Sequence, residues 1–507
     1  MTDTSFGYPD CNRAMARLSC HYSGAYLPVM STHLLHSWQC GIIAALVTLH
    51  VSCSGTSSNV RMEQTTNGIT SGGNLAMVAV RSTALAAARQ PVTTTKLGLA
   101  VLWHRPREIV SANTPVNHAV QSMSAEAPGT PEFEDLLDRM RFPSAEAGKL
   151  TWLVDGPAFF PELDRQITAA RHSIKLQVYI FDNDDIGVRY ADVLKGRASE
   201  VPVHVLFDDL GSTLAHRSAP GTLGPRGFVP PANMSACLQE KSKVRARRTL
   251  NPWLVCDHTK LLVFDEQSAI LGGMNIGREY YSEWHDLMVR VEGPIVQSLS
   301  REFSRAWSKA GPWGDFSLLR KPAIFRRHAP VTGGIPLRIL RTDPVDGRYE
   351  ILDASLLAIR GARKRVWIQN PYFAHDDLVL AVAAAAHRGV DVRVIIPKGG
   401  DSTLMDAGNL SSARSLIHAG AKVFMYPKMT HLKVMICDDW ASVGSANFDT
   451  LSMRINRELN LVFAGRAAVQ ELEKAVFLPD LRQSRRILPQ ETKGIANSLA
   501  ETLADQL

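Results

Sequence analysis

The sequence has no cluster of cysteines that would indicate a metal site or a disulfide framework. Its seven cysteines are scattered over 507 residues and match neither the spacing of a metal-ligand set nor that of a compact disulfide-bonded domain. Cys256 and Cys437 lie inside apolar runs, where a cysteine most often acts as a small buried hydrophobic residue. A Gly-x-x-x-x-Gly-Lys loop, which would hold nucleotide phosphates, is also missing. We therefore expect neither a metal nor a cofactor.

The apolar run near the N-terminus, from Gly41 to Val51, is too short to cross a bilayer but suits the core of an export signal. The Ser52-Cys53-Ser54 segment that follows resembles the processing site of a bacterial lipoprotein. On this interpretation Met30 is the true start, Cys53 carries lipid, and the protein faces the periplasm from the bacterial cell envelope. The alternative is a plain cleaved signal or a shallow apolar segment, because His50 stands where leucine is usual.

The net positive charge favours an anionic partner but does not show which kind. The formal net charge is +7, with 45% hydrophobic and 21% charged residues, which are values of a globular protein. Phospholipid headgroups, nucleic acids and phosphate esters are all attracted by such a charge. The basic segment Arg245 to Arg248 is either a solvated face or a contact for an anionic headgroup. The length allows two or three domains with sizeable cores.

The most informative pattern is a motif that occurs twice. The shared residues are His258, Lys260 and Asp265 in the first copy and His431, Lys433 and Asp438 in the second. Strand-forming residues follow each lysine, so the histidine and lysine of a copy lie on one face of an extended segment. A single His-x-Lys pair is weak evidence of function, but two copies in one chain are not plausibly coincidence.

Each copy is followed by a glycine-rich turn that contains an asparagine. The turns are Gly272-Gly273-Met274-Asn275 and Gly444-Ser445-Ala446-Asn447. The copies differ in two details: Gly273 stands where the second copy has Ser445, and the second copy is one residue shorter between its aspartate and its first glycine. Neither difference removes a reacting group.

The segments around the motifs repeat in the same order, which predicts a duplicated unit. Strands alternate with helices from about residue 151, so we expect an α/β fold: two tandem domains with mixed sheets flanked by helices, related by a pseudo-twofold axis. The predicted parts are an N-terminal extension (1–54), a tether with some helix near Leu75–Arg89 (55–145), domain 1 (146–311), a linker (312–334), domain 2 (335–487) and a tail (488–507).

Two histidines, two lysines and two asparagines that meet across such an axis suit the chemistry of a phosphodiester. The lysines supply charge and the asparagines supply amide donors for the non-bridging oxygens. One histidine can attack phosphorus while the other protonates the leaving alkoxide. We therefore expect the active site at the interface of the two domains, completed within a single chain.

The paired motif resembles the signature of the phospholipase D superfamily, His-x-Lys-x4-Asp in two copies, and the chain is most similar to the bacterial cardiolipin synthase branch. The resemblance covers about residues 150–480. The supporting segments are Tyr179–Phe181, Asp185–Gly187, Gly272–Tyr280, Trp284–Asp286, Pro371–Phe373, Arg388–Arg393 and Asn456–Glu458.

The resemblance implies roles for the residues that match. His258 would be the nucleophile that forms a phosphatidyl-histidine and His431 the general acid and then base, although the duplication makes the two nearly symmetric. Lys260, Lys433, Asn275 and Asn447 would hold the phosphate, with Ser445 as an additional donor. Asp286 and Glu458 would orient the imidazoles, and Asp265 and Asp438, though part of the catalytic signature, would be structural rather than reactive.

The resemblance also implies a membrane-associated enzyme that transfers a phosphatidyl group to an alcohol, most simply making cardiolipin from phosphatidylglycerol. Hydrolysis with water as the acceptor and phosphatidylserine synthesis use the same chemistry and stay open. A nucleic-acid phosphodiesterase is another alternative, but the envelope-type N-terminus and the two-copy form argue against nucleic acid as a partner. A non-catalytic envelope lipoprotein is disfavoured because both motifs are complete.

Overall fold

The computed structural model describes residues 72–111, 126–216, 221–222, 224–319 and 334–492. The predicted export signal and the predicted lipidation of Cys53 lie outside the described residues, as do most of the linker and most of the tail. In the described part of the chain, no helix combines the length and the apolar character needed to cross a membrane.

The strands of the described residues form one mixed sheet in which the same order occurs twice. In the first half the order is β1 (Glu146–Val154), β7 (Leu287–Glu292), β6 (Ser268–Gly272), β5 (Leu261–Phe264), β2 (Ile174–Val178), β3 (Val203–Asp208) and β4 (Arg245–Thr249). In the second half it is β8 (Ile335–Asp343), β15 (Glu458–Ala464), β14 (Trp440–Gly444), β13 (Val434–Cys437), β10 (Arg365–Gln369), β11 (Asp391–Pro397) and β12 (Lys422–Tyr426), with the short β9 (Arg348–Tyr349) and β16 (Arg485–Arg486) beside them. The predicted duplication and the mixed α/β fold are therefore confirmed.

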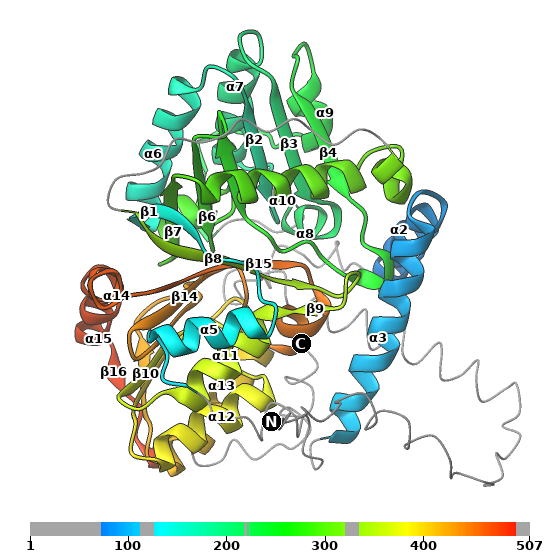
Figure 1. Ribbon diagram of the computed structural model, residues 1–507. Helices are drawn as coiled ribbons and strands as arrows, with labels where there is room; N and C mark the ends of the chain where they lie inside the picture. The colour runs from blue at the N-terminus through cyan, green and yellow to red at the C-terminus, as the bar shows by residue number, and fades with distance from the viewer. Residues whose placement is uncertain (1–71, 112–125, 217–220, 223, 320–333, 493–507) are drawn as a thin grey trace, which may run out of the picture. The chain divides into compact units, whose positions relative to one another are not determined.

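The two halves join through β1 and β8, which pair antiparallel at the centre of the sheet. The outer three strands of each half are parallel, β2–β3–β4 and β10–β11–β12, and the others are antiparallel. Figure 1 shows the strands of the first half in cyan and green and those of the second half in yellow and orange. Because the motif strands β5 and β13 follow the same path in each half, the two motifs occupy equivalent places.

Helices cover both faces of the sheet. In the first half they are α6 (Asp155–Ala169), α7 (Asp185–Arg197), α8 (Asp209–Ala215), α9 (Met234–Gln239) and α10 (Ile295–Lys309). In the second half they are α11 (Glu350–Gly361), α12 (Asp376–His387), α13 (Thr403–His418), α14 (Arg466–Leu472) and α15 (Leu478–Gln483). Short helical turns complete the set: η1 (Pro252–Leu254), η2 (Glu279–Glu283), η3 (Gly314–Leu319), η4 (Leu451–Ile455), η5 (Glu473–Phe477) and η6 (Pro489–Thr492).

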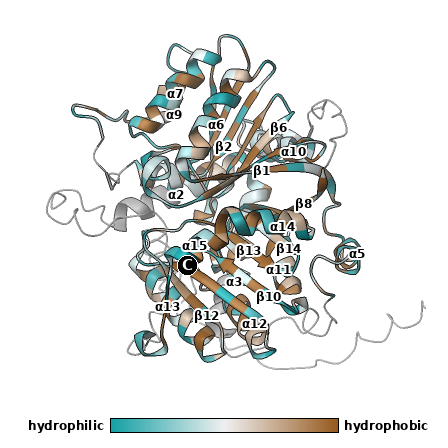
Figure 2. Ribbon diagram, turned by 90° about the vertical axis from the view of Figure 1, so that its left-hand side faces the viewer, coloured by the Kyte–Doolittle hydropathy of each residue, from teal (hydrophilic) through white to brown (hydrophobic). Residues whose placement is uncertain are grey.

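The central strands are apolar on both sides because they are covered on both sides. In β5, Leu261 and Val263 belong to the apolar cluster that includes α10, whereas Leu262 and Phe264 belong to the cluster that includes α6 and α7. The first of these clusters also contains residues of β13, β15 and η5, so the two halves share it. Figure 2 shows hydrophobic brown along much of the strands. This shared layer fixes the two motifs relative to each other.

Two helical segments of the second half have local features of their own. The helix α13 begins at Thr403, where the Ser402 hydroxyl accepts a hydrogen bond from the Met405 amide. The segment after β15 is not one continuous α-helix, because α14 is followed by the π-helical turn η5 and then by α15.

The region predicted as a tether contains three described helices, α2 (Gly72–Arg89), α3 (Pro91–Ser111) and α5 (Pro131–Arg139). The helix expected near Leu75–Arg89 corresponds to α2. The amphipathic α5 buries Phe133 in the core of the second half, where its ring packs edge-on against Trp440 with centroids 6.0 Å apart. Arg338 of β8 pairs with Glu134 of α5 at 2.8 Å. The chain just before the first half therefore packs on the second half.

Candidate active site

The backbone of each motif histidine is bonded to the other half of the chain. The His258 amide donates to the Arg457 carbonyl at 2.9 Å, and the His431 amide donates to the His285 carbonyl at 2.7 Å. Arg457 and His285 each directly precede one of the two predicted orienting acids. The β-strands begin immediately after the motif lysines, at Leu261 and Val434, so each His-x-Lys segment forms the entry to a buried strand.

The side chains cross between the halves in the same way. His258 Nδ1 lies 3.0 Å from Glu458 Oε1, and His431 Nδ1 lies 2.7 Å from Asp286 Oδ2. Each carboxyl group therefore serves the histidine of the opposite half, and the site exists only where the halves meet. With Nδ1–H donated to the carboxyl group, the Nε2 atom of each ring is left to react.

Both imidazoles are held in the neutral form. Burial lowers the pKa of His258 well below its ordinary value, and the positive charges of Lys260 and Lys433 lower it further. Burial and the same two lysines also lower the pKa of His431 well below its ordinary value. A neutral imidazole has a free lone pair on Nε2, which is the form that a nucleophile or a general base needs.

The two motif lysines lie beside the histidines. Lys260 Nζ donates to the His258 carbonyl at 2.7 Å, and Lys433 Nζ donates to the His431 carbonyl at 2.7 Å. Burial lowers the pKa of Lys260 to about 7 and that of Lys433 to about 8, although nearby carboxyl groups oppose the shift. An ammonium group has three donors, so each lysine keeps donors for the oxygens of a bound phosphate. A phosphate dianion or monoanion would also favour their charged form.

Aromatic rings surround the two imidazoles. The ring of Tyr179 meets His258 edge-on at 4.8 Å between centroids and lies 5.0 Å from Lys260 Nζ. On the other side, the rings of Trp284 and Tyr280 lie 5.0 and 5.8 Å from His431. No role was predicted for these aromatic residues, although all of them fall in segments that carried the family resemblance. Only the fold shows that they form the walls of the site.

The two carboxyl groups are supported differently. The Ser445 hydroxyl donates to Glu458 Oε2 at 2.5 Å and accepts from the Leu459 amide at 3.0 Å. The equivalent residue of the first copy is Gly273, where an added Cβ would lie 2.2 Å from Asp286 Oδ1. The first copy therefore uses a glycine to make room for a short acid, and the second uses a serine to hold a longer one. In this structure Ser445 contacts Glu458, whereas the sequence predicted a contact with the phosphate.

The close approach at Gly273 makes a testable prediction. The substitution Gly273→Ala should displace the Asp286 carboxyl group and reduce turnover by about 10²-fold, because a misplacement of about 1 Å has that effect. The thermal midpoint should change little. Gly196→Ala is the control, since an added Cβ there has no atom within 4 Å. Steady-state kinetics on both variants would measure the difference, and equal turnover in the two would contradict the role given to Gly273.

The two predicted phosphate-binding asparagines stand on the loops after β6 and β14. Asn275 Oδ1 accepts from the Ile180 amide at 2.9 Å and its Nδ2 donates to the Tyr280 hydroxyl at 2.8 Å, which leaves one amide N–H unused. Asn447 is 6% exposed, and its Oδ1 has no hydrogen-bond partner among the described residues. The first amide is thus held in place, and the second has an unused polar atom beside the site.

The two signature aspartates are not brought to the histidines. The three amides that donate to the Asp265 carboxylate are those of Arg171, His172 and Ser173, at 2.6–2.9 Å. The three that donate to the Asp438 carboxylate are those of Arg363, Lys364 and Arg365, at 2.8–3.0 Å. Each aspartate thus stands at the far end of its motif strand and holds the turn that enters β2 or β10. This placement agrees with a structural role.

Removing one of these carboxylates is expected to affect stability rather than chemistry. Asp438→Ala leaves three amides without their acceptor and should lower the free energy of unfolding by about 1–3 kcal/mol. Turnover per folded molecule should change by less than about threefold, because Asp438 does not contact the histidines. Urea unfolding and active-site-normalised kinetics would measure the two effects. An inactive Asp438→Ala protein of normal stability would contradict this assignment.

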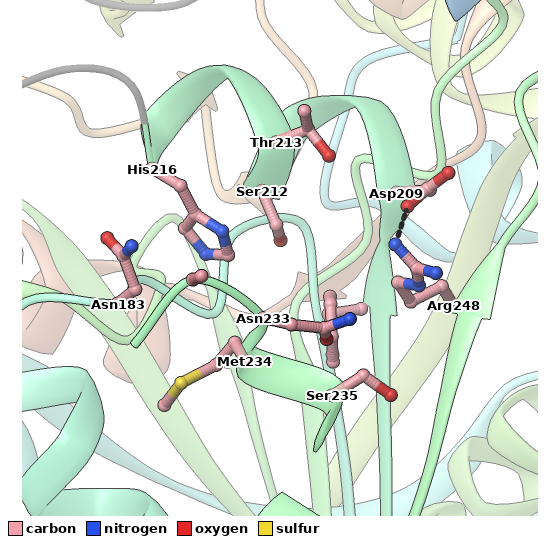
Figure 3. A pocket seen from close by; sticks show the side chains of 11 residues that line it. Asn183, Asp209, Ser212, Thr213, His216, Asn233, Met234, Ser235 and Arg248 are labelled. Carbon is pink, nitrogen blue, oxygen red and sulfur yellow. Dashed lines mark hydrogen bonds and ion pairs between the residues drawn. The ribbon is translucent and has the colours of Figure 1, made fainter. Parts of the chain in front are cut away.

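The basic segment Arg245–Arg248 forms β4, and two of its side chains are engaged within the protein. Arg247 stacks on Trp307 at 4.1 Å, and Arg248 pairs with Asp209 at 2.6 Å. Figure 3 shows this ion pair among the residues that line a cavity between α8 and the start of α9. The volume of the cavity is about 300 Å³. The ring of Tyr179 packs on Gly211 of α8, so it stands between this helix and His258. The cavity therefore lies beside the histidine site and does not contain it.

Among the residues that the structure describes, no group of three or more His, Cys, Asp or Glu side chains is arranged to hold a metal ion. The groups that contact each other at the site are two imidazoles, two carboxyls and two ammonium groups. Such a set can bind a phosphodiester, attack its phosphorus and protonate its leaving group.

Comparison with known proteins gives a consistent result. Residues 163–307 and 356–476 match the family described as "Cardiolipin synthase, PLD-like domain". The chain is 30% identical over 370 residues to cardiolipin synthase A of Pseudomonas entomophila (strain L48), covering 70% of this chain and 72% of that protein. It is 31% identical over 367 residues to the probable cardiolipin synthase YwiE of Bacillus subtilis (strain 168), covering 69% of this chain and 70% of that protein.

A solved structure shares the fold. The crystal structure of phosphatidylserine synthase from Haemophilus influenzae Rd KW20 aligns with a TM-score of 0.55 at 14% identity, covering 73% of this chain and 98% of that one. At that identity the match shows the fold alone. The family match over both halves and the relatives at 30–31% identity lead to one assignment. The chain belongs to the phospholipase D superfamily, in the cardiolipin synthase-like family of phosphatidyltransferase enzymes.

Proposed function

We propose that this protein makes cardiolipin from phosphatidylglycerol by transferring a phosphatidyl group through a covalent phosphohistidine. The observation that carries the proposal is the crossed pair of neutral histidines, each bonded to a carboxyl group of the opposite half and placed beside a lysine. The similarity to cardiolipin synthases supports the choice of substrate.

In the first step His258 Nε2 attacks the phosphorus of a bound phosphatidylglycerol. A P–N bond forms, the bond from phosphorus to the glycerol headgroup breaks, and His431 gives its proton to the departing alkoxide. For this step His431 must enter the cycle protonated, a state that the bound anionic phosphate favours. Lys260 and Lys433 hold the non-bridging oxygens, with Asn275 and Asn447 as further donors.

In the second step the hydroxyl group of another phosphatidylglycerol is the acceptor. His431, now neutral, takes the proton of that hydroxyl, whose oxygen attacks phosphorus while the P–N bond to His258 breaks. The cycle converts two phosphatidylglycerol molecules to one cardiolipin and one glycerol, and both histidines return to their starting states. Glu458 and Asp286 keep the two rings in the tautomer that leaves Nε2 at the phosphorus.

Other acceptors fit the same two steps. Water would give hydrolysis, as in a phospholipase D, and the hydroxyl of serine would give phosphatidylserine synthesis. A nucleic-acid phosphodiesterase would use the same histidines on a different ester. Similarity to cardiolipin synthases over about 70% of the chain favours the lipid reaction over the nucleic-acid reaction and over a non-catalytic envelope lipoprotein.

We also propose that the enzyme works at the surface of the bacterial membrane, since its substrates are bilayer lipids. Export and acylation of Cys53 are part of this proposal and rest on the sequence alone. Mass analysis of the mature protein tests them: acylation requires a chain that begins at Cys53 and carries a lipid mass. A mature chain that retains residues 1–52 would contradict export processing.

The function is tested with purified full-length protein, labelled phosphatidylglycerol and a DNA control. Labelled cardiolipin should form and should decrease when glycerol is added, because glycerol is the other product and reverses the transfer. Phosphatidic acid as the sole product would instead assign hydrolysis. Cleavage of DNA without any turnover of lipid would contradict the proposal.

A further inference from the structure

Exposed apolar side chains concentrate in one region of the described chain. Most large hydrophobic residues that are exposed there belong to α2 or α3, or lie in or directly before the turns η1 and η3, which contact these helices. They are Val80, Leu85, Val92, Leu99, Leu102, Trp103, Trp253, Trp313 and Phe316. A concentration of exposed apolar side chains often marks a binding site for a protein or a membrane. Figure 1 shows α2 and α3 in blue at the margin of the sheet and its flanking helices.

The helix α3 has two apolar faces, of which the protein covers one. Leu97 and Val101 are buried in a small cluster with residues of η4 and of the segment before the first motif. At about 100° per residue, Val92, Leu99 and Leu102 project from the opposite side of the helix. They are 53%, 63% and 64% exposed. The fold thus accounts for the inner face of α3 and leaves its outer face apolar.

The charged side chains of α2 and α3 between residues 80 and 104 are all cations. Between residues 80 and 104 the charged side chains are Arg81, Arg89 and Lys96, all three exposed, and the same stretch contains no aspartate or glutamate. Lys96 lies between Val92 and Leu99 on the outer face of α3 by helical spacing. An apolar stripe with cations beside it suits the boundary between anionic headgroups and acyl chains.

We propose that the outer face of α3, around Val92, Leu99 and Leu102, lies on the surface of an anionic phospholipid bilayer. The proposal rests on the proposed function, because it names the surface through which the enzyme reaches its lipid substrate. The helix is not apolar enough to cross a membrane, so it would lie in the plane of the interface. A second copy of the chain is disfavoured as the occupant, because a symmetric contact would bring cations of both copies together without an acid.

Hydroxyl-radical footprinting of the full-length protein tests the contact directly. With vesicles of phosphatidylglycerol, the oxidation of Leu99 and Leu102 should fall at least fivefold relative to the protein alone. Leu380 of α12 is the internal control, since it is 67% exposed and lies on another helix, so its oxidation should not change. Vesicles of phosphatidylcholine should protect much less. Unchanged oxidation of Leu99 on protein that has bound the anionic vesicles would overturn the proposal.

A pair of variants gives the functional readout. Leu99→Asp combined with Leu102→Asp should reduce transfer on phosphatidylglycerol vesicles at least tenfold. The same double variant should transfer normally on a monomeric short-chain phosphatidylglycerol. The control variant Leu380→Asp should transfer normally on both substrates. If the double variant transferred normally on vesicles, the proposal would be overturned. It would also be overturned if the double variant lost self-association but still bound the vesicles. If neither the unmodified protein nor any variant showed transfer, but vesicles still protected Leu99 from oxidation, the proposed function would be rejected. The membrane contact would then be retained.

Discussion

His258→Ala is expected to lower phosphatidyl transfer by at least about 10⁴-fold, because it removes the nucleophile that forms the covalent intermediate. The loss should be as large on a phosphatidyl ester with p-nitrophenol as the leaving group. An activated leaving group does not replace the missing nucleophile. Steady-state rates on the natural and the activated lipid, each measured with the folded variant, give the two numbers.

His431→Ala should show a different pattern. On phosphatidylglycerol the loss should again be large, since no group protonates the glycerol alkoxide. On the p-nitrophenyl ester the first step should recover, because p-nitrophenolate leaves without a proton, and a burst of p-nitrophenol should appear. A burst in His258→Ala and none in His431→Ala would show that the two histidines have the opposite roles.

The second large effect is expected from the crossed carboxyl groups. Glu458→Gln should reduce transfer by about 10³-fold or more, since the amide can donate a hydrogen bond to Nδ1 and so place the proton on the reacting nitrogen. Because Glu458 contacts His258 although the two lie in different halves, this variant should resemble His258→Ala and give no burst with the activated ester. Asp286→Asn should resemble His431→Ala and keep the burst.

The Glu458→Gln and Asp286→Asn variants can be compared without a large change in packing. Glutamine and asparagine are close in shape to the acids that they replace, so the packing of the core should persist. Glu200→Gln is the control, since that side chain is exposed and pairs with Arg197 at the surface. If Glu458→Gln affected the second step and Asp286→Asn the first, each acid would serve the histidine of its own half, contrary to the structure.

The sequence was sufficient to predict the duplicated fold and the imidazoles, ammonium groups and carboxyl groups that meet between the halves, but not the aromatic rings around them. The second copy of His-x-Lys placed His431 opposite His258, and alternating strands and helices predicted mixed sheets. Strands such as β5 and β13 were readily predicted because they are short, continuously apolar runs. The boundaries 146–311 and 335–487 stay predictions, and the packing of α5 on the second half shows that the chain before domain 1 also contributes to a core.

The pairing of each acid with the histidine of the opposite half could not be predicted from the sequence. Asp286 follows the first motif and Glu458 the second, so proximity along the chain would have given each histidine the acid of its own half. The crossing arises from β1 and β8, which join the halves antiparallel and bring each motif against the opposite half. Spacing in the sequence also does not reveal distances of a few ångströms. Such distances determine the contact of Ser445 with Glu458 and the need for glycine at position 273.

Trapping of the covalent intermediate tests the proposed mechanism most directly. His431→Ala, mixed with phosphatidyl p-nitrophenol and quenched in alkali, should accumulate the intermediate, because the first step proceeds and the second lacks its base. Mass spectrometry of the digested protein should find the phosphatidyl group on His258. A phosphatidyl group on another residue, or a burst of p-nitrophenol with an unmodified His258, would show that His258 is not the nucleophile.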